Sequence, residues 1–368
     1  MTGNRWTANA SLNGICPYFT MFPLDFPLKI LKRRAKKNDR VLDPFCGRGT
    51  TGFAARLVGL SSMSVDSSPV AAAITGAKLV HVSAEEIMLE AHAILSNYKP
   101  SYLPSGEFWE LAYHPTVLDG LCRFRHAFME DSSSDVRIAL RGIILGALHG
   151  PKQKTFPSYF SNQCPRTYAP KPGYSCRFWR ERNLLPDIVD IIEIIRRRAN
   201  RYYSDSQKSA GQVRLADSRN QSALLPAEPD SPFKWIITSP PYYGMRTYLP
   251  DQWLRRWLLG GSDTVDYSVD NQIIHSSPES FANDLRTVWQ NAARVSTDDA
   301  RMVIRFGGIA DRKAKPLDLI KSSLDSSGWV IKAVRPAGLA TEGKRQANTF
   351  LRSKSNPVCE YDIWTAHR

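Results

Sequence analysis

The chain has 368 residues, 42% of them hydrophobic, and can therefore bury one large core, or one core with a substantial insertion. Its 49 Lys and Arg residues outnumber 35 Asp and Glu residues, and the net charge of +14 indicates a polyanionic partner, most simply a nucleic acid. The first residues do not have the pattern expected of a signal peptide, and the sequence has no C-x-x-C pair and no apolar run near the ~20 residues that span a bilayer. We therefore expect a soluble cytoplasmic protein with no membrane partner and no bound metal.

Two strand–helix units begin the predicted fold. Residues 40–43 form a short β-type run, and a glycine turn leads from them into residues 51–59, whose apolar positions have helical spacing. The next strand is predicted at 61–66 and the next helix at 68–80, where Pro69 suits the first turn. Two such units in succession predict a parallel sheet covered by helices.

A mainly helical insertion is expected to interrupt this sheet. Residues 84–210 carry little β signal and show helical patterns around a polar, aromatic loop at 151–183. Strand patterns then resume at 212–217, 234–239, 301–306, 329–334 and 359–366. A loop joins the last two strands, which indicates an antiparallel pair at one edge. We expect an α/β fold with seven strands, mostly parallel, with one antiparallel edge strand and a helical insertion.

The glycine turn has the features of a nucleotide-binding site. Gly47 and Gly49 lie where a parallel strand turns into a helix, so the backbone can approach a ligand closely and offer amide donors. Asp43 ends the first strand and Asp66 ends the second, where an acid can accept hydrogen bonds from ribose hydroxyls. A tight turn with helix-capping acids would produce the same pattern.

Two motifs resemble those of the amino-methylating DNA methyltransferases. "DPFCGRGTT" (43–51) resembles their S-adenosylmethionine-binding motif, D-P-F-x-G-x-G-T, and "TSPPY" (238–242) resembles their catalytic motif, (S/D/N)-P-P-(Y/F/W). Residues 18–31 are similar to the piece that closes over the methionine end of the cofactor. Residues 213–220 resemble the third-strand motif, whose acid, here Asp217, faces the adenine amine.

This resemblance covers about 1–80 and 212–368 and implies a Rossmann-like class I methyltransferase. It implies that S-adenosyl-L-methionine contacts residues of the matching segments, namely Thr20, Phe22, Asp43, Phe45, Gly47, Gly49, Thr50, Asp66 and Asp217. The insertion between the second and third strands departs from the usual layout of the family. We expect a catalytic domain at 1–83 and 211–368 and a separate helical region at 84–210.

The Ser-Pro-Pro-Tyr turn suits methylation of an exocyclic amine, whose lone pair is delocalised into the base. The Ser239 hydroxyl and the Pro240 carbonyl can accept the amine N–H groups and aim the nitrogen, while Pro240 and Pro241 fix the carbonyl direction. Tyr242 offers a face on which a flipped base can stack. This chemistry needs no metal and no covalent intermediate. A plain strand-ending turn is the alternative interpretation.

The resemblance also bears on the target base. In this family a Ser in the first motif position usually accompanies cytosine N4, and an Asp or Asn more often accompanies adenine N6. The correlation has exceptions, so Ser239 favours cytosine and leaves adenine open. Cytosine C5 methylation needs an attacking thiolate, usually from a Pro-Cys pair, and the sequence contains none.

The insertion is the predicted target-recognition element. Residues 151–202 hold 11 Lys and Arg against 4 Asp and Glu, interleaved with aromatic and amide side chains that suit phosphates and bases. The candidate DNA contacts are Lys152, Lys154, Arg166, Lys171 and, just after the catalytic turn, Arg246. The alternative is a solvated face of a helical subdomain.

Together these features predict a site-specific methyltransferase that acts on cytosine N4 in double-stranded DNA. The expected setting is restriction-modification or a related defence or epigenetic role, with a cognate restriction endonuclease as a candidate partner. Three alternatives stay open: adenine N6 methylation, an RNA base methyltransferase, and a non-catalytic DNA-binding protein on the same scaffold. No separate RNA-binding module is visible, and the intact motifs argue against loss of catalysis.

Overall fold

The computed structural model describes residues 10–18, 22–152, 156–164, 171–204, 210–228, 231–244, 249–265, 277–308, 314–339 and 359–368. The chain divides into two compact units. The helical unit comprises Met1–Tyr18, Gly76–Lys208 and Tyr248–Val269, and the sheet unit comprises Phe19–Thr75, Ser209–Thr247 and Asp270–Arg368. The helical unit thus takes in 1–18, 76–83 and 248–269, which the sequence-based division placed with the catalytic part.

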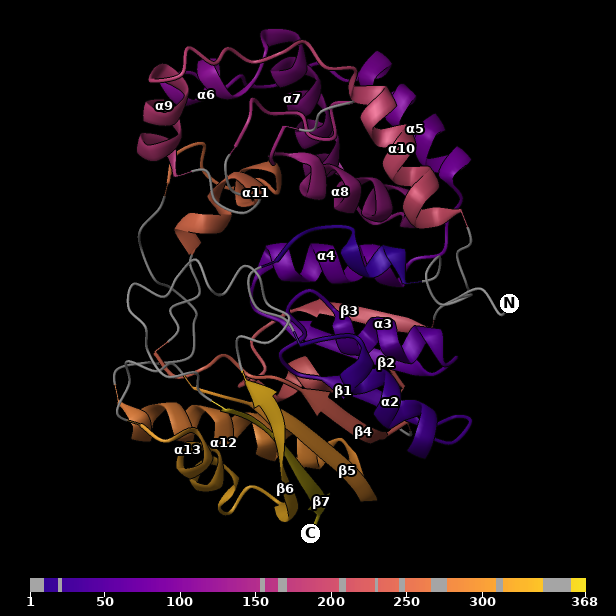
Figure 1. The fold of residues 1–368 in the computed structure, drawn as a ribbon. Helices are drawn as coiled ribbons and strands as arrows, with labels where there is room; N and C mark the ends of the chain where they lie inside the picture. The colour runs from indigo at the N-terminus through magenta and orange to yellow at the C-terminus, as the bar shows by residue number, and fades with distance from the viewer. Residues whose placement is uncertain are drawn as a thin grey trace, which may run out of the picture. The chain divides into compact units, whose positions relative to one another are not determined.

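The sheet unit contains a seven-stranded sheet in the order β3-β2-β1-β4-β5-β7-β6 (Figure 1). The strands are β1 (Arg40–Asp43), β2 (Ser61–Asp66), β3 (Gly211–Leu215), β4 (Phe233–Thr238), β5 (Ser296–Phe306), β6 (Trp329–Leu339) and β7 (Cys359–His367). Pairing is parallel from β3 to β5, whereas β7 runs antiparallel to both β5 and β6. The predicted fold class is confirmed, and the antiparallel strand lies one position inside the outermost β6.

Helices cover both faces of this sheet, as a parallel sheet requires. They are α2 (Asp25–Arg34), α3 (Thr50–Leu57), α4 (Pro69–Leu79), α12 (Pro278–Arg294) and α13 (Pro316–Leu324), with a short 3-10 helix, η2 (Gln221–Leu224). The alternation of β4 sends Ile236 to the core beneath α12 and α13, while Trp235 and Ile237 pack in the core beneath α2 and α3. Both cores therefore support the end of β4.

The helical unit is built from amphipathic helices with regular N-caps. It contains η1 (Ser11–Gly14), α5 (Ala84–Asn97), α6 (Glu107–Ala112), α7 (Pro115–Glu130), α8 (Asp135–Ala147), α9 (Pro172–Arg180), α10 (Ile191–Tyr203), η3 (Leu249–Gln252) and α11 (Trp253–Leu258). Ser83 and Glu86 form a capping box on α5, and Asp190 caps α10. The expectation of a loop throughout 151–183 was wrong for α9. Pro172 begins this helix, and Cys176 and Trp179 are buried.

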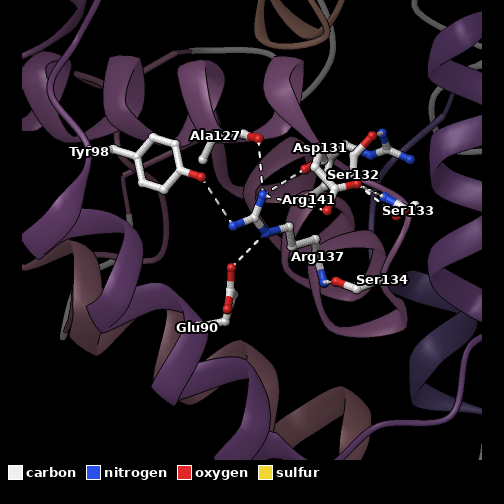
Figure 2. A network of polar contacts seen from close by, with 9 residues as sticks. All are labelled: Glu90, Tyr98, Ala127, Asp131, Ser132, Ser133, Ser134, Arg137 and Arg141. Atoms are coloured by element: carbon white, nitrogen blue, oxygen red, sulfur yellow. Dashed lines mark hydrogen bonds and ion pairs between the residues drawn. The ribbon is translucent and has the colours of Figure 1, made fainter.

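Arg137 joins three helices of the helical unit (Figure 2). Its Nε donates to Glu90 of α5 at 2.7 Å, and its Nη2 donates to the Tyr98 hydroxyl at 3.3 Å. Its Nη1 donates to the carbonyls of Ala127 at 3.4 Å and Asp131 at 3.0 Å, at the end of α7. The Ala127 carbonyl also accepts from the Asp131 N–H at 3.0 Å, so the guanidinium of α8 adds a second hydrogen bond there and bonds to the Asp131 carbonyl just beyond the helix. None of the described helices combines the length and apolar character needed to cross a bilayer.

Candidate cofactor and catalytic site

The glycine turn after β1 has two left-handed glycines with different surroundings. Gly49 has φ +76°, and a Cβ there would lie 2.7 Å from the Thr75 side chain of α4. Thr75 also donates its hydroxyl to the Gly47 carbonyl at 3.0 Å, which holds the turn in place. Gly47 has φ +51°, and a Cβ there would meet no protein atom within 4 Å. The backbone at Gly47 is therefore open to close approach by a ligand.

Asp66, at the end of β2, is oriented by backbone amides. Its Oδ2 accepts from the Gly47 N–H at 2.8 Å, and its Oδ1 accepts from the Ser68 N–H at 2.9 Å. Burial raises the pKa of Asp66, and these two hydrogen bonds act in the opposite direction. The carboxylate is thus fixed beside the glycine turn, and each oxygen keeps a second lone pair.

A shallow pocket that is open to solvent lies at the carboxyl ends of β1, β2 and β3. It is lined by Pro44, Phe45, Asp66, Ser67, Ala216, Asp217, Ser218 and Arg219. Both predicted acids therefore line one cavity, together with the ring of Phe45, which packs edge-on against Trp289 at 5.9 Å. Parallel α/β sheets bind ligands at the carboxyl ends of their strands. The strand order of this sheet reverses beside the pocket, between β1 and β4.

Asp217 is paired with a residue that sequence reasoning missed. Arg219 places its Nη2 2.7 Å from the Asp217 carboxylate and its Nη1 3.0 Å from Asp284 of α12. Burial alone would raise the pKa of Asp217, but the hydrogen bonds and charge of Arg219 outweigh it, and the pKa is lowered. Asp217 is therefore held as a carboxylate, which accepts hydrogen bonds.

The loop that carries Asp217 is braced from two sides. The Ser218 hydroxyl donates to the Pro44 carbonyl at 2.7 Å. The Asn291 amide, on α12, donates to the carbonyls of Ser218 at 3.1 Å and Arg219 at 2.8 Å. Ser218 and Arg219 could have been suspected because they follow Asp217 directly, whereas the role of Asn291 depends on how α12 packs.

The Ser-Pro-Pro-Tyr turn adjoins the glycine turn through two hydrogen bonds. β1 and β4 are parallel neighbours, with Val41 opposite Trp235. Beyond that register the Thr238 hydroxyl donates to Asp43 Oδ1 at 2.7 Å, and the Thr51 hydroxyl of α3 donates to the Ile237 carbonyl at 3.0 Å. The structure thus brings the two sequence motifs together, and Ser239 directly follows this contact.

Asp43 is the most deeply buried acid of this region, with 1% of its surface exposed. Besides Thr238, it accepts from the Phe45 N–H at 3.2 Å. Burial raises the pKa of Asp43 to about 7, against the lowering effect of its hydrogen bonds and with a small contribution from the charge of Asp66. Its contacts connect the two turns.

The remaining residues predicted for the cofactor have mixed environments. Phe22 is 9% exposed and packs edge-on against Phe26 at 5.3 Å. Thr50 is buried as the first residue of α3. Thr20 lies outside the described residues.

Ser239 and Tyr242 follow the end of β4, and Tyr242 forms a polar contact with β7. Ser239 and Pro241 are half-buried and Pro240 is buried. The Tyr242 hydroxyl donates to Glu360 Oε1 at 2.6 Å, and its ring packs edge-on against Phe306 at 5.3 Å. Glu360 was not predicted from the sequence. The sequence pointed to Glu360 only as an acidic residue within a predicted strand that is otherwise partly apolar.

Two of the predicted DNA contacts lie in described parts of the helical unit. Lys152 is 2.8 Å from Asp187, and both side chains are well exposed. Lys171, also exposed, is 3.8 Å from the buried Asp251. Lys154, Arg166 and Arg246 lie outside the described residues. Across the ranges that the structure describes, no three His, Cys, Asp or Glu side chains are grouped as a metal site would require.

Comparisons with known proteins point to the same class of enzyme. A family model described as a DNA methylase matches residues 3–75, the part that contains the glycine turn. The Type II methyltransferase M.Cfr9I of Citrobacter freundii is 34% identical over 86 residues, which are 23% of this chain and 22% of that protein. The match therefore spans about a fifth of the relative. These two comparisons support a DNA amino-methyltransferase.

Similarity to solved structures extends over most of the chain but is low. The rRNA methyltransferase AviRa of Streptomyces viridochromogenes is 12% identical, with 96% of this chain and 92% of that chain covered and a TM-score of 0.35. A SAM-dependent methyltransferase of Methanosarcina mazei is 9% identical, with coverages of 94% and 98% and a TM-score of 0.35. The fold assignment therefore depends on the strand order and pairing.

Proposed function

We propose that this protein methylates the exocyclic N4 amine of cytosine in double-stranded DNA, with S-adenosyl-L-methionine as the methyl donor. The observation that carries the proposal is the junction between the two turns, where Thr238 bonds to Asp43 and Thr51 bonds to Ile237. A cofactor-binding turn and an amine-orienting turn must be neighbours for direct transfer, because the reacting atoms have to come within about 3–3.5 Å.

The adenosine part of this cofactor would bind in the pocket beside the glycine turn. Asp66 would accept from the ribose hydroxyls, and Asp217 from the adenine amine, since both carboxylates line the cavity. Phe45 supplies an apolar wall, and the open side of Gly47 leaves room for the methionine part. We propose that the other residues predicted to contact the cofactor, Phe22 and Thr50 among them, surround this site.

The catalytic turn would orient the target amine. When bound, S-adenosyl-L-methionine would supply an activated methyl group for the amine nitrogen. Ser239 and the Pro240 carbonyl would accept the amine N–H groups and aim the nitrogen lone pair. Pro241 keeps the carbonyl direction fixed, and Tyr242 would contact the flipped base.

We also propose that the helical unit contacts the DNA, through the insertion 84–210 and the predicted cations Lys152, Lys154, Arg166, Lys171 and Arg246. Helix α9 supports this idea. Tyr174 and Phe178 stack on it at 6.5 Å, and the Arg182 guanidinium lies 4.2 Å from the Phe178 ring centre. Arg177, on the same helix, is exposed. An exposed surface of aromatic rings and guanidinium groups suits phosphates and unstacked bases.

Expression in a host that lacks DNA methylation would test the proposal. The DNA is digested to nucleosides and analysed by mass spectrometry, and we expect N4-methylcytosine. N6-methyladenine would overturn the choice of base, and methylated RNA with unmodified DNA would overturn the choice of nucleic acid. Absence of any methylated base, with no cofactor binding by calorimetry, would indicate a DNA-binding scaffold instead.

Ser239→Ala provides the matched control for this experiment. It removes one acceptor of the amine and leaves the cofactor pocket intact. We expect at least a 10²-fold loss of methyl transfer, with unchanged cofactor affinity, by analogy with the loss of one preorganised polar group. Retained activity would contradict the role assigned to Ser239.

A restriction-modification setting is part of the proposal, because the matched relative is a Type II methyltransferase. In that setting a cognate endonuclease would cut the same sequence in unmodified DNA. Sequencing at single-nucleotide resolution should then find the methylated base at one short sequence throughout the host DNA. Scattered modification without a common sequence would contradict site specificity.

A further inference from the structure

Arg219 lies between two acids in the lining of the pocket at the carboxyl ends of β1, β2 and β3. Its guanidinium contacts Asp217 on the loop after β3 and Asp284 on α12. The side chains of Arg219 and Asp217 are 25% and 28% exposed, and both residues line the pocket. A ligand in the pocket can therefore reach the hydrogen-bonding groups that this pair leaves unused.

The contacts of Asp217 leave one acceptor site on its carboxylate. Its Oδ1 accepts from the backbone N–H of Arg219 at 2.9 Å. The Arg219 Nε donates to Oδ1 at 3.1 Å and to Oδ2 at 3.0 Å, and its Nη2 donates to Oδ2 at 2.7 Å. A carboxylate has about four lone-pair sites. Among the described residues only these N–H groups occupy them, so one site remains for a donor from a ligand.

The guanidinium of Arg219 has donors that the protein does not use. An arginine side chain carries five N–H donors and no acceptor. Its Nε and Nη2 donate to Asp217, and its Nη1 donates to Asp284 at 3.0 Å. In the described part of the chain, one N–H on each terminal nitrogen is therefore left without an acceptor. The pocket thus presents a fixed acceptor and fixed donors side by side.

This pattern is complementary to the amine edge of adenine. Adenine offers its N6 amine as a donor, next to a ring nitrogen that accepts hydrogen bonds. Asp217 would accept from the amine while Arg219 donates to the ring nitrogen. Hypoxanthine has a carbonyl in place of the amine and would turn an acceptor toward the carboxylate. We infer that Arg219 is a specificity-determining residue, which reads the adenine of the cofactor together with Asp217.

The backbone that carries Arg219 is held independently of its side chain. The Asn291 amide donates to the carbonyls of Ser218 and Arg219, and the Ser218 hydroxyl donates to the Pro44 carbonyl. Removal of the guanidinium should therefore change which groups the pocket offers while the loop keeps its course. The inference rests on the proposed function, since it concerns the cofactor of the same reaction.

The binding of two nucleoside ligands tests the inference without any methyl transfer. The probes are S-adenosylhomocysteine and its deaminated analogue, S-inosylhomocysteine, and their dissociation constants are measured by calorimetry. The wild type should bind the adenine form about 10–10²-fold more tightly, as expected for paired contacts to a base edge. In Arg219→Met this ratio should fall about tenfold, because one charged hydrogen bond to the base is lost and Asp217 is no longer held.

Further variants separate the reading of the base from folding. Arg219→Lys keeps the charge and some donors without the planar fork, so it should recover part of the ratio. Asp217→Asn can turn its amide N–H toward the base and should shift the preference toward the inosine form. Arg286→Met is the matched control. It removes a guanidinium of α12 that bonds to Asn283 and to the Ser322 carbonyl, and it should leave the ratio unchanged.

The ratio of the two affinities decides between the possible results. If Arg219→Met weakens both ligands by the same factor, or weakens neither, Arg219 has no part in reading the base and the inference is overturned. Equal binding of the two ligands by the wild type would also overturn it and would leave the proposed function standing. A wild type that binds neither ligand would refute the proposed function, and with it the role of Arg219.

Discussion

Gly49 combines a backbone requirement with a steric one. Its φ of +76° is unfavourable for any residue with a Cβ, and that Cβ would lie 2.7 Å from Thr75. We expect Gly49→Ala to lower the free energy of unfolding by about 1–3 kcal/mol, measured by urea denaturation. Gly47→Ala has the strain without the clash and should destabilise less. The loss of cofactor affinity should be larger in Gly47→Ala, since its Cβ would point into open space. Equal stability losses would contradict this account.

Asp43 should make the stability depend on pH. Burial raises its pKa from 3.8 to about 7, so the folded state favours the protonated acid. The resulting stabilisation is fully present below about pH 4 and is lost as the pH rises through about 7. Asp66 contributes in the same direction, because its pKa is also raised.

Asp43→Asn isolates this effect. Asparagine can still accept from the Thr238 hydroxyl but does not titrate, so the urea midpoint should fall less between pH 5 and pH 8 than in the wild type. Between these two pH values, the free energy of unfolding of the wild type should fall by a few kcal/mol more than that of the variant, since one pKa unit corresponds to about 1.4 kcal/mol. An identical pH dependence in the variant would show that Asp43 keeps an ordinary pKa.

At the scale of elements, α5, the end of α7 and α8 depend on Arg137 (Figure 2). Arg137→Met keeps much of the side-chain volume but removes the ion pair with Glu90 and the guanidinium's hydrogen bonds to the carbonyls of Ala127 and Asp131. We expect a loss of about 2–4 kcal/mol, visible as faster hydrogen exchange in α7 and α8. Arg196→Met removes an exposed ion pair with Glu193 on α10 and should cost less than about 1 kcal/mol. Equal costs would contradict the special position of Arg137.

Sequence patterns predicted the strands well, because alternation and β-branched residues are local properties. Each predicted strand lies within or beside an observed one, and β5 and β6 extend beyond the predicted bounds. Long-range order was not accessible in this way. The insertion of β7 between β5 and β6 depends on pairings across the whole sheet. Helix α9 was missed because Pro172 and its aromatic residues are as typical of loops as of a helix start.

The candidate site could be predicted only where its residues are local in sequence. The motifs located Asp43, Asp66 and Ser239, and the structure places Asp43 beside Thr238. Glu360 meets Tyr242 across 118 positions of the chain, and Asn291 contacts the pocket loop from α12. Such contacts follow from packing, so a single sequence contains no signal for the partner.

At the scale of the molecule, charge should govern DNA binding. Arg177→Gln combined with Arg182→Gln removes two exposed cations at and just beyond α9. We expect weaker DNA binding. The slope of the logarithm of the binding constant against the logarithm of the salt concentration should become shallower by roughly 0.9 for each phosphate that the variant no longer neutralises. Lys321→Gln combined with Lys332→Gln removes the same charge from exposed positions of the sheet unit. If both pairs change the slope equally, the net charge matters and α9 makes no specific contact with DNA.

The position of the insertion has a consequence for biosynthesis. β1 pairs with β2 early in the chain, but the other partners of these strands, β4 and β3, follow only after the insertion. The outer edges of β1 and β2 therefore stay unpaired while residues 67–210 leave the ribosome. At ~5–20 residues per second this takes on the order of ten seconds. Open parallel edges are prone to aggregation. Packing of helices α5 to α10 against one another during this interval would shorten the search for β3, and slow translation of this segment should raise the yield of active protein.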